Sequence, residues 1–260
     1  MPIKIITWNI NSVRARHDRL LALLARHQPD VLCLQELKAE DEKFPRKEVE
    51  AAGYHAELAG QKTYNGVAIL SREPAEDVRR GLDDGEDDPQ ARLISARVRG
   101  IRVFSAYFPN GDMPSSPKYT YKHAWMDRLA RKLGQQFSKD EPLALCGDFN
   151  VAPSDLDVKN VAKWADTVLC RPDIREKLDA IRAFGLVDTL RQVKPDVPNL
   201  YSFWDYTQLS FPKNDGLRID HIDVTAPLAE RLIDVVIDRE ERKGEKPSDH
   251  APVIATFADV

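Results

Sequence analysis

One pattern occurs twice in this chain, in Asp30-Val-Leu-Cys-Leu-Gln-Glu36 and in Pro142-Leu-Ala-Leu-Cys-Gly-Asp148: a short apolar run that ends in an acid. Short apolar runs of this kind are typical of strands that are buried on both faces. Each run also follows a helical pattern that itself follows a strand pattern. The repetition predicts two similar halves, each of which brings one carboxylate from a strand end to a shared cleft.

Strand and helix patterns continue on both sides of these two runs. Apolar or alternating stretches predict strands at residues 3–9, 31–35, 66–71, 93–98, 101–108, 143–147, 217–224 and 253–257. Helical periodicity predicts helices at residues 13–27, 121–137 and 173–184. This order indicates a mixed sheet, or two stacked sheets, with helices outside. Because no Gly/Ser-rich or Pro-rich linker divides the chain, we expect a single domain over residues 1–260.

The composition is that of an ordinary globular protein, with 42% hydrophobic and 31% charged residues. It excludes a disordered chain, a collagen-like fibre and a disulfide scaffold. No apolar run approaches the roughly 20 residues of a membrane span, and the first residues lead directly into a strand, so we expect neither membrane contact nor secretion. Cys33 and Cys146 lie within apolar runs, which favours buried thiols in a reducing cytoplasm.

The net charge and the absence of several known sequence motifs limit the classes of enzyme to which the chain can belong. The net charge of −4 is not the global basic footprint of a DNA-coating protein, yet it is compatible with a nuclease, because a divalent-metal site needs uncompensated carboxylates. The chain has no P-loop, no Gly-x-Gly-x-x-Gly after a strand, no Gly-x-Ser-x-Gly and no Cys or His pairs at zinc-finger spacing. Nucleotide-driven, dinucleotide-dependent and serine-hydrolase chemistry are therefore disfavoured.

Polar side chains gather near the ends of the predicted strands: Asn9, Asn11, Glu36, Asp148, Asn150, Asp220, Asp249 and His250. A single Asp or Asn at a strand end is more often a turn former or a cap, and we assign Asp223 to that class and His221 to a structural role. Together, however, oxygen ligands from several strand ends suit Mg²⁺ or Mn²⁺ and not zinc. A histidine held by a buried acid can donate a hydrogen bond to a phosphoryl oxygen. The set predicts metal-assisted phosphoester hydrolysis.

Six motifs follow one another from the first strand to the last: Trp8-Asn-Ile-Asn11, Leu34-Gln-Glu36, Tyr107-Phe-Pro-Asn-Gly111, Gly147-Asp-Phe-Asn150, Arg218-Ile-Asp220 and Ser248-Asp-His-Ala-Pro252. Through them the chain resembles the endonuclease–exonuclease–phosphatase superfamily, and more closely the exonuclease III branch of DNA-repair apurinic/apyrimidinic (AP) endonucleases. One such motif is weak, whereas six in this order are specific. The resemblance implies a four-layered α/β sandwich: two mixed β-sheets packed face to face with helices outside, and the site at their shared edge.

The resemblance also implies a metal-dependent enzyme. Its cofactor would be Mg²⁺, for which Mn²⁺ would substitute, and the residues that would hold this ion are Asn9, Glu36 and Asp249. An alternative within the same chemistry is a second metal ion held by Asp148, Asn150 and His250.

The chemistry at the phosphate follows from the same resemblance. Asp148 would orient or deprotonate the attacking water, helped by Asn150. Tyr107 and His250 would hydrogen-bond the scissile phosphate, with Asp220 orienting the histidine. In-line attack would leave a 3′-hydroxyl primer end and a 5′-phosphate.

The implied substrate is double-stranded DNA with abasic sites or 3′ ends, bound by a monomer. An apolar slot accepts a flipped-out abasic sugar and excludes a normal base, and its expected walls are Phe203, Trp204 and Leu217. The other positions expected to contact DNA are Asn11, Arg92, Asn110, Lys122 and Asn160. Contacts to phosphates position a duplex without reading its sequence. The chain departs from the family pattern at Ser12-Val13 and in a shorter segment after Asp157.

Two other functions fit parts of this pattern. A phosphoesterase of the same fold that acts on an inositol phosphate, a sphingolipid or poly(A) would need different loops. A non-catalytic DNA-binding module would have lost at least one central residue, yet the chain retains Glu36, Asp148, Asp220 and His250. We therefore expect an exonuclease III-like enzyme that cleaves 5′ to abasic sites, removes nucleotides or blocking groups from 3′ ends, or does both.

Overall fold

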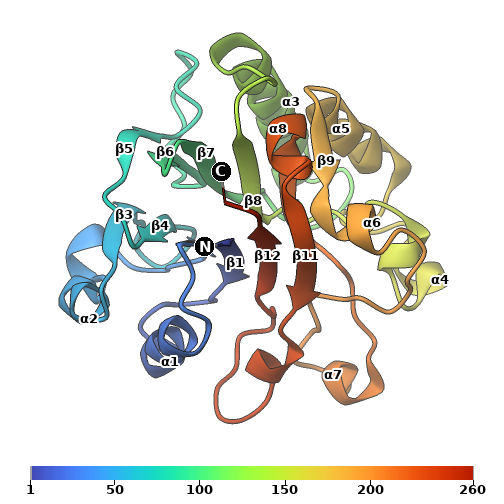
Figure 1. The fold of residues 1–260 in the computed structure, drawn as a ribbon. Helices are drawn as coiled ribbons and strands as arrows, with labels where there is room; N and C mark the ends of the chain where they lie inside the picture. Colours follow the sequence, from blue (N-terminus) through green and yellow to red (C-terminus); the bar gives the residue numbers. More distant parts are fainter. Residues whose placement is uncertain (1, 260) are drawn as a thin grey trace.

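The computed structural model, which describes residues 2–259, contains two six-stranded mixed sheets (Figure 1). The first has the strand order β11-β12-β1-β2-β4-β3, and its strands are β1 (Ile3–Asn9), β2 (Val31–Gln35), β3 (His55–Ala59), β4 (Val67–Ser71), β11 (Leu232–Ile237) and β12 (Val253–Phe257). The second has the order β5-β6-β7-β8-β10-β9, and its strands are β5 (Glu76–Arg80), β6 (Leu93–Val98), β7 (Ile101–Tyr107), β8 (Leu143–Asp148), β9 (Leu186–Asp188) and β10 (Asp220–Thr225). The two repeated apolar runs form β2 and β8, an inner strand of each sheet.

Helices lie on the outer side of each sheet (Figure 1). The first sheet is covered by α1 (His17–His27) and α2 (Arg46–Ala51), and the second by α3 (Pro117–Gln136) and α5 (Pro172–Arg182). Shorter helical segments lie in the connections: α4 (Val161–Trp164), α6 (Thr189–Val193), α7 (Ser210–Lys213), α8 (Ala226–Ala229) and the 3₁₀ turns Asp41–Lys43, Asp155–Asp157 and Arg239–Arg242. No helix within residues 2–259 is long and apolar enough to cross a membrane.

The apolar core consists of three layers: one between the two sheets, and one between each sheet and the helices that cover it. Leu32 of β2 packs with Leu20 of α1, whereas its neighbour Cys33 belongs to the cluster between the two sheets. In the same way, Leu145 of β8 packs toward α3, and its neighbour Cys146 belongs to the cluster between the sheets. Successive side chains of a strand point to opposite faces, so both faces of these strands are apolar and their sequences read as continuous apolar runs. The four-layered α/β sandwich expected from the sequence is confirmed.

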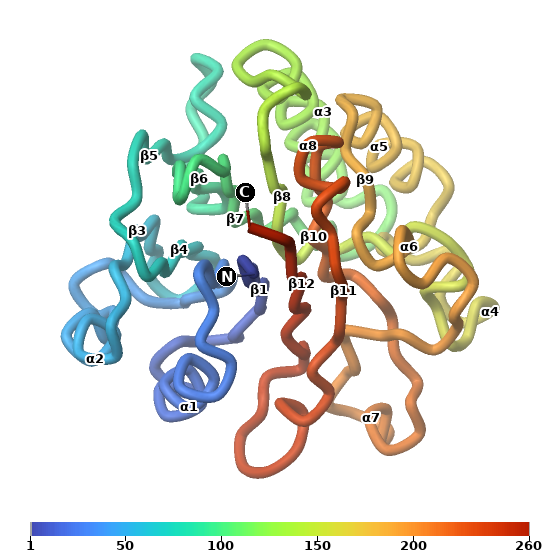
Figure 2. Tube along the Cα trace, in the orientation of Figure 1, coloured from blue at the N-terminus to red at the C-terminus, as the bar shows by residue number. Residues whose placement is uncertain are grey.

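The two ends of the chain meet in the first sheet. β1 pairs antiparallel with β12, with Ile3 opposite Phe257, and Figure 2 shows the two strands side by side. β1 also pairs in parallel with β2. The loop before β12 is therefore held at the same edge of the sheet as the ends of β1 and β2, although it is more than 200 residues away from them in sequence.

The predicted strands are all present, and the structure adds four more. The additions are β3, β5, β9 and β11, which are the edge strands of the two sheets. All four are at least partly exposed; β3 and β5 carry polar residues and β9 has only three residues, whereas β11 (Leu-Ile-Asp-Val-Val-Ile) is largely apolar and its pattern was missed. The predicted helix at residues 121–137 begins earlier, at Pro117, because the Ser116 side chain caps it by accepting a hydrogen bond from the Tyr119 amide.

Gly147→Ala is expected to destabilise the protein by about 3 kcal/mol or more. Gly147 lies opposite Ala106 in the parallel pair β7–β8, and a Cβ atom at Gly147 would stand 1.9 Å from the Ala106 carbonyl oxygen. Urea unfolding measures the loss. The matched control is Gly134→Ala in α3, where a Cβ meets nothing within 4 Å and helix propensity favours Ala by up to about 1 kcal/mol. Equal stabilities of the two variants would contradict this packing of β7 against β8.

Candidate functional site

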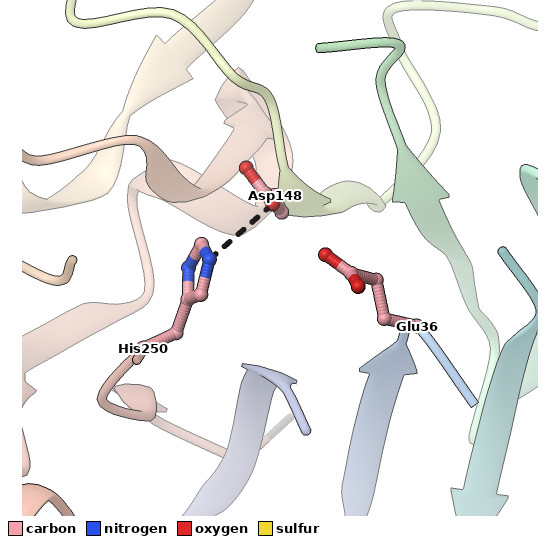
Figure 3. Close-up of side chains that lie close together, drawn as sticks. All are labelled: Glu36, Asp148 and His250. Atoms are coloured by element: carbon pink, nitrogen blue, oxygen red, sulfur yellow. Dashed lines mark ion pairs between the residues drawn. The ribbon is translucent and has the colours of Figure 1, made fainter. Parts of the chain in front are cut away.

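Three predicted site residues converge at the shared edge of the two sheets (Figure 3). Glu36 directly follows β2 of the first sheet, Asp148 ends β8 of the second, and His250 lies in the loop before β12. Each offers one ligand atom, and these atoms lie within 4.8 Å of one another. The two apolar runs of the sequence thus each deliver a carboxylate to one place, from different sheets.

A single buried amide joins the two carboxylates. The Asn9 Nδ2 group, at the end of β1, donates to Glu36 Oε1 at 2.8 Å and to Asp148 Oδ2 at 2.9 Å. Its own Oδ1 accepts from the Asn11 backbone N–H at 3.0 Å. Since both amide donors are used on the carboxylates, Asn9 fixes the distance between the acid of one sheet and the acid of the other.

Glu36 is held as a carboxylate in an unusual backbone conformation. Its φ of +54° lies in the left-handed region, which costs a residue other than glycine about 1 kcal/mol or more. Burial raises the pKa of Glu36, but the Lys38 ammonium, whose Nζ lies 2.8 Å from Glu36 Oε2, and the Asn9 hydrogen bond together bring it below its usual value. Glu36 is therefore ionised at neutral pH.

His250 is held as a cation by the acids around it. Its Nδ1 donates to Asp220 Oδ2 at 2.8 Å, and the Ser202 hydroxyl donates to the same oxygen at 2.6 Å. Burial lowers the pKa of His250, but the carboxylates of Asp220 and Asp148 raise it to about 10. The protonated Nε2 lies 3.7 Å from Asp148 Oδ2. His250 is therefore a hydrogen-bond donor, which suits a phosphoryl oxygen.

Asp148 is the most perturbed acid of the group. Its Oδ1 accepts from the Asn150 backbone N–H at 2.9 Å. Burial raises the pKa of Asp148 to about 7, with further increases from Asp220 and Glu36 and an opposing decrease from His250. A carboxylate with a pKa near neutrality is suited to accepting a proton from water.

Tyr107 closes one side of the group. It ends β7, opposite Asp148 in the parallel pair β7–β8. Burial, together with Glu36 and Asp148, raises the pKa of the Tyr107 hydroxyl well above its usual value, so the hydroxyl keeps its proton and can donate it in a hydrogen bond. The Arg92 guanidinium lies 4.8 Å from the centre of the tyrosine ring. Both side chains line a pocket of about 690 Å³, as does Asn110.

Two predicted metal ligands lie beside the three-residue group and not in it. Asp249 Oδ1 accepts from Asn11 Nδ2 at 2.8 Å, and among residues 2–259 the acids and histidines gathered within 4.8 Å do not include Asp249. The Asn150 amide accepts from Asn110 Nδ2 at 3.0 Å and donates to the Phe108 carbonyl at 3.0 Å. The structure thus places Asn150 as a tie between two loops.

Some of the predicted DNA contacts are accessible. Asn110 and Asn160 are exposed, and Arg92 and Phe203 are half-buried. The Phe203 ring lies 4.9 Å from the His250 ring, centre to centre. An aromatic face is therefore available directly beside the three-residue group.

Trp204 and Leu217 require a correction, because both are fully buried and cannot wall an open slot. The Trp204 indole N–H donates to Asn214 Oδ1 at 3.1 Å, and its ring packs edge-on against Phe211. It also lies so close to Gly216 that a Cβ there would stand 2.5 Å from the Trp204 Nε1 atom. An aromatic-rich stretch is compatible both with a binding slot and with core packing, and at Trp204 it is core packing.

Lys122 also requires a correction, because its ammonium points inward. The side chain is 0% exposed, and its Nζ donates to the carbonyl oxygens of Asn110, Asn150 and Val168. Burial lowers the pKa of Lys122 to about 7, and the Asp148 carboxylate opposes this shift. In this position Lys122 does not present a charge to a DNA phosphate.

Sequence reasoning missed two residues that hold the site. Lys38 bonds Glu36, and Ser202 bonds Asp220, as described above. The spacing of two between Glu36 and Lys38 is a signal that could have indicated the first. Ser202 carries no comparable signal, because it reaches Asp220 only through the isolated bridge that pairs Phe203 with Leu217.

A second group of acids and a histidine has a different character. Asp188, His221 and Asp223 also offer ligand atoms within 4.8 Å, but two arginines already occupy them. Arg182 Nε lies 2.7 Å from Asp223 Oδ2, and Arg218 Nη2 lies 2.7 Å from Asp188 Oδ2. This group is a buried ion-pair network. Asp223, expected to be a turn former, is instead a fully buried member of it, and the structural role expected for His221 agrees with its contact to Arg218.

Asp157→Asn is expected to lower stability by about 2 kcal/mol near neutral pH, and the loss should shrink in acid. Asp157 Oδ1 accepts from Arg218 Nε at 2.6 Å and from Arg191 Nη2 at 2.6 Å. Burial raises the pKa of Asp157, but Arg218 and Arg191 bring it down to about 2 from an ordinary 3.8. Because the folded-state pKa is the lower one, the stabilisation is present above the ordinary pKa and is lost as the pH falls toward 2.

Urea unfolding between about pH 5 and pH 3 measures this pH dependence. Asp155→Asn is the control, because the Asp155 side chain is 64% exposed and pairs with Arg175 at the surface. Its effect should stay within about 0.5 kcal/mol at every pH. A constant offset between wild type and Asp157→Asn over this range would contradict the assignment.

Known proteins share both the sequence pattern and the fold. The family described as the Endonuclease/Exonuclease/phosphatase family matches residues 6–250. An exodeoxyribonuclease III of Haemophilus influenzae is 38% identical over 266 residues, covering 98% of this chain and all of the relative. An AP endonuclease structure from Archaeoglobus fulgidus superposes with a TM-score of 0.96 at 40% identity, covering 99% of this chain and all of that one. A Neisseria 3′ phosphatase bound to a product DNA hairpin gives 0.96 at 43% identity, with the same coverage.

Proposed function

The chain belongs to the endonuclease/exonuclease/phosphatase family and is a hydrolytic DNA-repair nuclease, and we propose that it uses Mg²⁺ to cleave duplex DNA 5′ to abasic sites and at 3′ ends. The observation that carries the proposal is the convergence of Glu36, Asp148 and His250 from both sheets. Two acids and a cationic histidine at one point match the needs of phosphodiester hydrolysis: oxygen ligands for a hard cation, a proton acceptor and a donor to the phosphate.

The residues of the site fit a hard cation. Glu36 and Asp148 offer carboxylate oxygens; within residues 2–259 no arginine hydrogen-bonds either of them, and the cation on Glu36 is the half-buried Lys38 ammonium, whose Nζ lies 2.8 Å from Oε2. Carboxylate oxygens are the donors that Mg²⁺ and Mn²⁺ prefer. Glu36 and Asp148 would hold the ion, with Asn9 orienting both acids and Asp249 adding negative charge behind Asn11. When bound, the ion polarises a phosphoryl oxygen and neutralises its charge.

The protein's own groups supply the remaining chemistry. Asp148 accepts a proton from the attacking water, whose oxygen forms the new bond to phosphorus. His250 and Tyr107 donate hydrogen bonds to the phosphoryl oxygens, and Asp220 keeps His250 charged and oriented. The bond from phosphorus to the 3′ oxygen breaks, and that oxygen takes up a proton. The products are a 3′-hydroxyl and a 5′-phosphate.

The DNA is proposed to lie across the accessible residues around this group. Phe203, half-buried beside His250, would contact the baseless sugar. Arg92 and Asn110, which line the pocket next to Tyr107, would contact the backbone, together with Asn11 and Asn160. We further propose that the protein acts as a monomer, and that it is cytoplasmic, because Cys33, Cys146 and Cys170 are free and buried.

A nicking assay tests the proposal. The substrate is a labelled duplex with one tetrahydrofuran abasic analogue, and a blunt duplex with a labelled 5′ end reports 3′ digestion. With Mg²⁺ we expect incision 5′ to the analogue, shortening of the blunt duplex, loss of both in EDTA and restoration by Mn²⁺. Absence of both incision and 3′ digestion with Mg²⁺ and Mn²⁺ would overturn the proposal.

A further inference from the structure

We propose that Lys122 is a positioning residue for the proposed nuclease reaction: its buried ammonium ties three loops together and thereby fixes the segment that carries Asp148 and Asn150. The inference rests on the proposed function. It replaces the role of a DNA phosphate contact, which the sequence suggested for Lys122, with a role inside the protein.

Every donor of the ammonium is already engaged. Lys122 Nζ donates to the Asn150 carbonyl at 2.7 Å, to the Val168 carbonyl at 2.7 Å and to the Asn110 carbonyl at 3.1 Å. A lysine ammonium has three N–H donors and no acceptor. Since three carbonyls use all three donors, and the side chain is 0% exposed, a DNA phosphate has neither a free donor nor a path to one.

The three carbonyls belong to segments that do not otherwise form a sheet or a helix together. Asn110 lies in the loop after β7, Asn150 in the loop after β8, and Val168 in the connection between α4 and α5. Hydrogen bonds from a charged donor are stronger than neutral ones. One cation thus adds to the few backbone hydrogen bonds between these irregular segments, such as that from the Ala152 N–H to the Leu169 carbonyl at 2.8 Å.

Asn150 connects the Lys122 ammonium to the Asp148 carboxylate. The Asn150 carbonyl accepts from Lys122, and the Asn150 backbone N–H donates to Asp148 Oδ1 at 2.9 Å. The Asn150 side chain bonds Asn110 Nδ2 at 3.0 Å and the Phe108 carbonyl at 3.0 Å. Asn150 has a φ of +50°, a left-handed conformation that asparagine adopts more readily than most residues, and these contacts hold it there. Lys122 supplies part of that support.

The stem of Lys122 packs against Gly111 of the loop after β7. Gly111 has a φ of +102°, and a Cβ there would stand 3.2 Å from Lys122 Cδ and 3.0 Å from Tyr119 Cδ2. The loop after β7 therefore fits closely around the lysine stem. A residue enclosed in this way acts through the loops that it holds.

Lys122→Met keeps most of the volume of the side chain and removes its three donors. We expect kcat on the abasic duplex to fall about 10- to 100-fold, because a small displacement of Asp148 from its working position is costly. KM should stay within about threefold, and the slope of log Kd against log salt concentration should be unchanged. A phosphate contact would instead raise KM and reduce that slope by about 1. Lys47→Met, at an exposed lysine of α2, is the matched control and should change none of these quantities.

A measurement on the wild-type protein covers the case in which Lys122→Met does not fold. Reductive methylation with formaldehyde, followed by peptide mass spectrometry, should leave Lys122 unmodified with and without the abasic duplex and should modify Lys47 in both cases. Modification of Lys122 in the free protein that the duplex prevents would overturn the inference. So would a folded Lys122→Met variant with wild-type kcat, or with a raised KM and a reduced salt slope. Failure of the wild type to nick the duplex would overturn the proposed function and with it the positioning role, whereas the methylation result would still decide whether the Lys122 ammonium is enclosed.

Discussion

Asp148→Asn should reduce the rate of phosphodiester cleavage by about 10³-fold or more while leaving DNA affinity within a few-fold of wild type. The substitution keeps the shape of the side chain but only one of its two acceptor oxygens, so the variant can accept from Asn9 Nδ2 or from the Asn150 backbone N–H but not from both. It removes the negative charge that accepts a proton from the attacking water and helps to hold the metal ion. The accessible residues around the site, which are proposed to bind the duplex, are unchanged.

Single-turnover cleavage and fluorescence anisotropy separate the rate from the affinity. The matched control is Asp127→Asn in α3, since Asp127 forms a half-exposed ion pair with Lys177, with an Nζ–Oδ1 distance of 2.8 Å. Asp127→Asn should cleave like wild type. An Asp148→Asn variant that cleaves within tenfold of wild type would remove Asp148 from the proposed chemistry.

His250→Asn should lower the cleavage rate by about 10²- to 10³-fold. The variant loses the cationic donor to the phosphate and leaves Asp220 without its partner. Because Asp220 and Asp148 raise the pKa of His250 to about 10, the required form is the protonated one. The wild-type rate should therefore rise with pH as Asp148, whose pKa is about 7, loses its proton, and should fall again as the pH rises through about 10.

A pH–rate profile of Asp220→Asn tests this explanation. Removing the Asp220 charge removes the largest contribution that raises the pKa of His250, so the alkaline loss of activity should move to lower pH. An alkaline limb in the same place in wild type and Asp220→Asn would show that another group titrates there.

The sequence could predict the centre of the fold better than its rim. Val31–Gln35 and Leu143–Asp148 are buried throughout, and their apolar runs indicated strands directly. Glu76–Arg80 is exposed or half-exposed along its length. Most of its side chains are therefore polar, and its sequence shows no strand pattern. Burial on both faces is what makes a strand visible in a sequence, and edge strands lack it.

The sequence predicted those parts of the candidate site that lie at the ends of strands. Glu36 and Asp148 end apolar runs, and topology alone brings such ends together. The direction in which a long or aromatic side chain points could not be predicted in this way. Lys122 bonds Val168, which is 46 residues further along the chain, and the Arg239 guanidinium lies 5.2 Å from the centre of the Trp204 ring, so segments that are distant in sequence cover both side chains. Charge and aromaticity were visible in the sequence, whereas burial was not.

Two groups of acids with a histidine occur within residues 2–259, and they differ in the partners of their carboxylates. Asp188 and Asp223 are each paired with a buried guanidinium at 2.7 Å. Glu36 is instead paired with the half-buried Lys38 ammonium at 2.8 Å, and the Asn9 amide joins it to Asp148, which faces His250. The same residue types thus serve stability in one place and are available for chemistry in the other.

The most direct test of the central claim is a crystal of the protein soaked with Mn²⁺ and measured at a wavelength that reveals manganese by anomalous scattering. We expect an anomalous peak in direct coordination with the carboxylates of Glu36 and Asp148, and none at Asp188 and Asp223. A protein that cleaves abasic DNA with Mn²⁺ but binds the ion away from Glu36 and Asp148 would contradict the account.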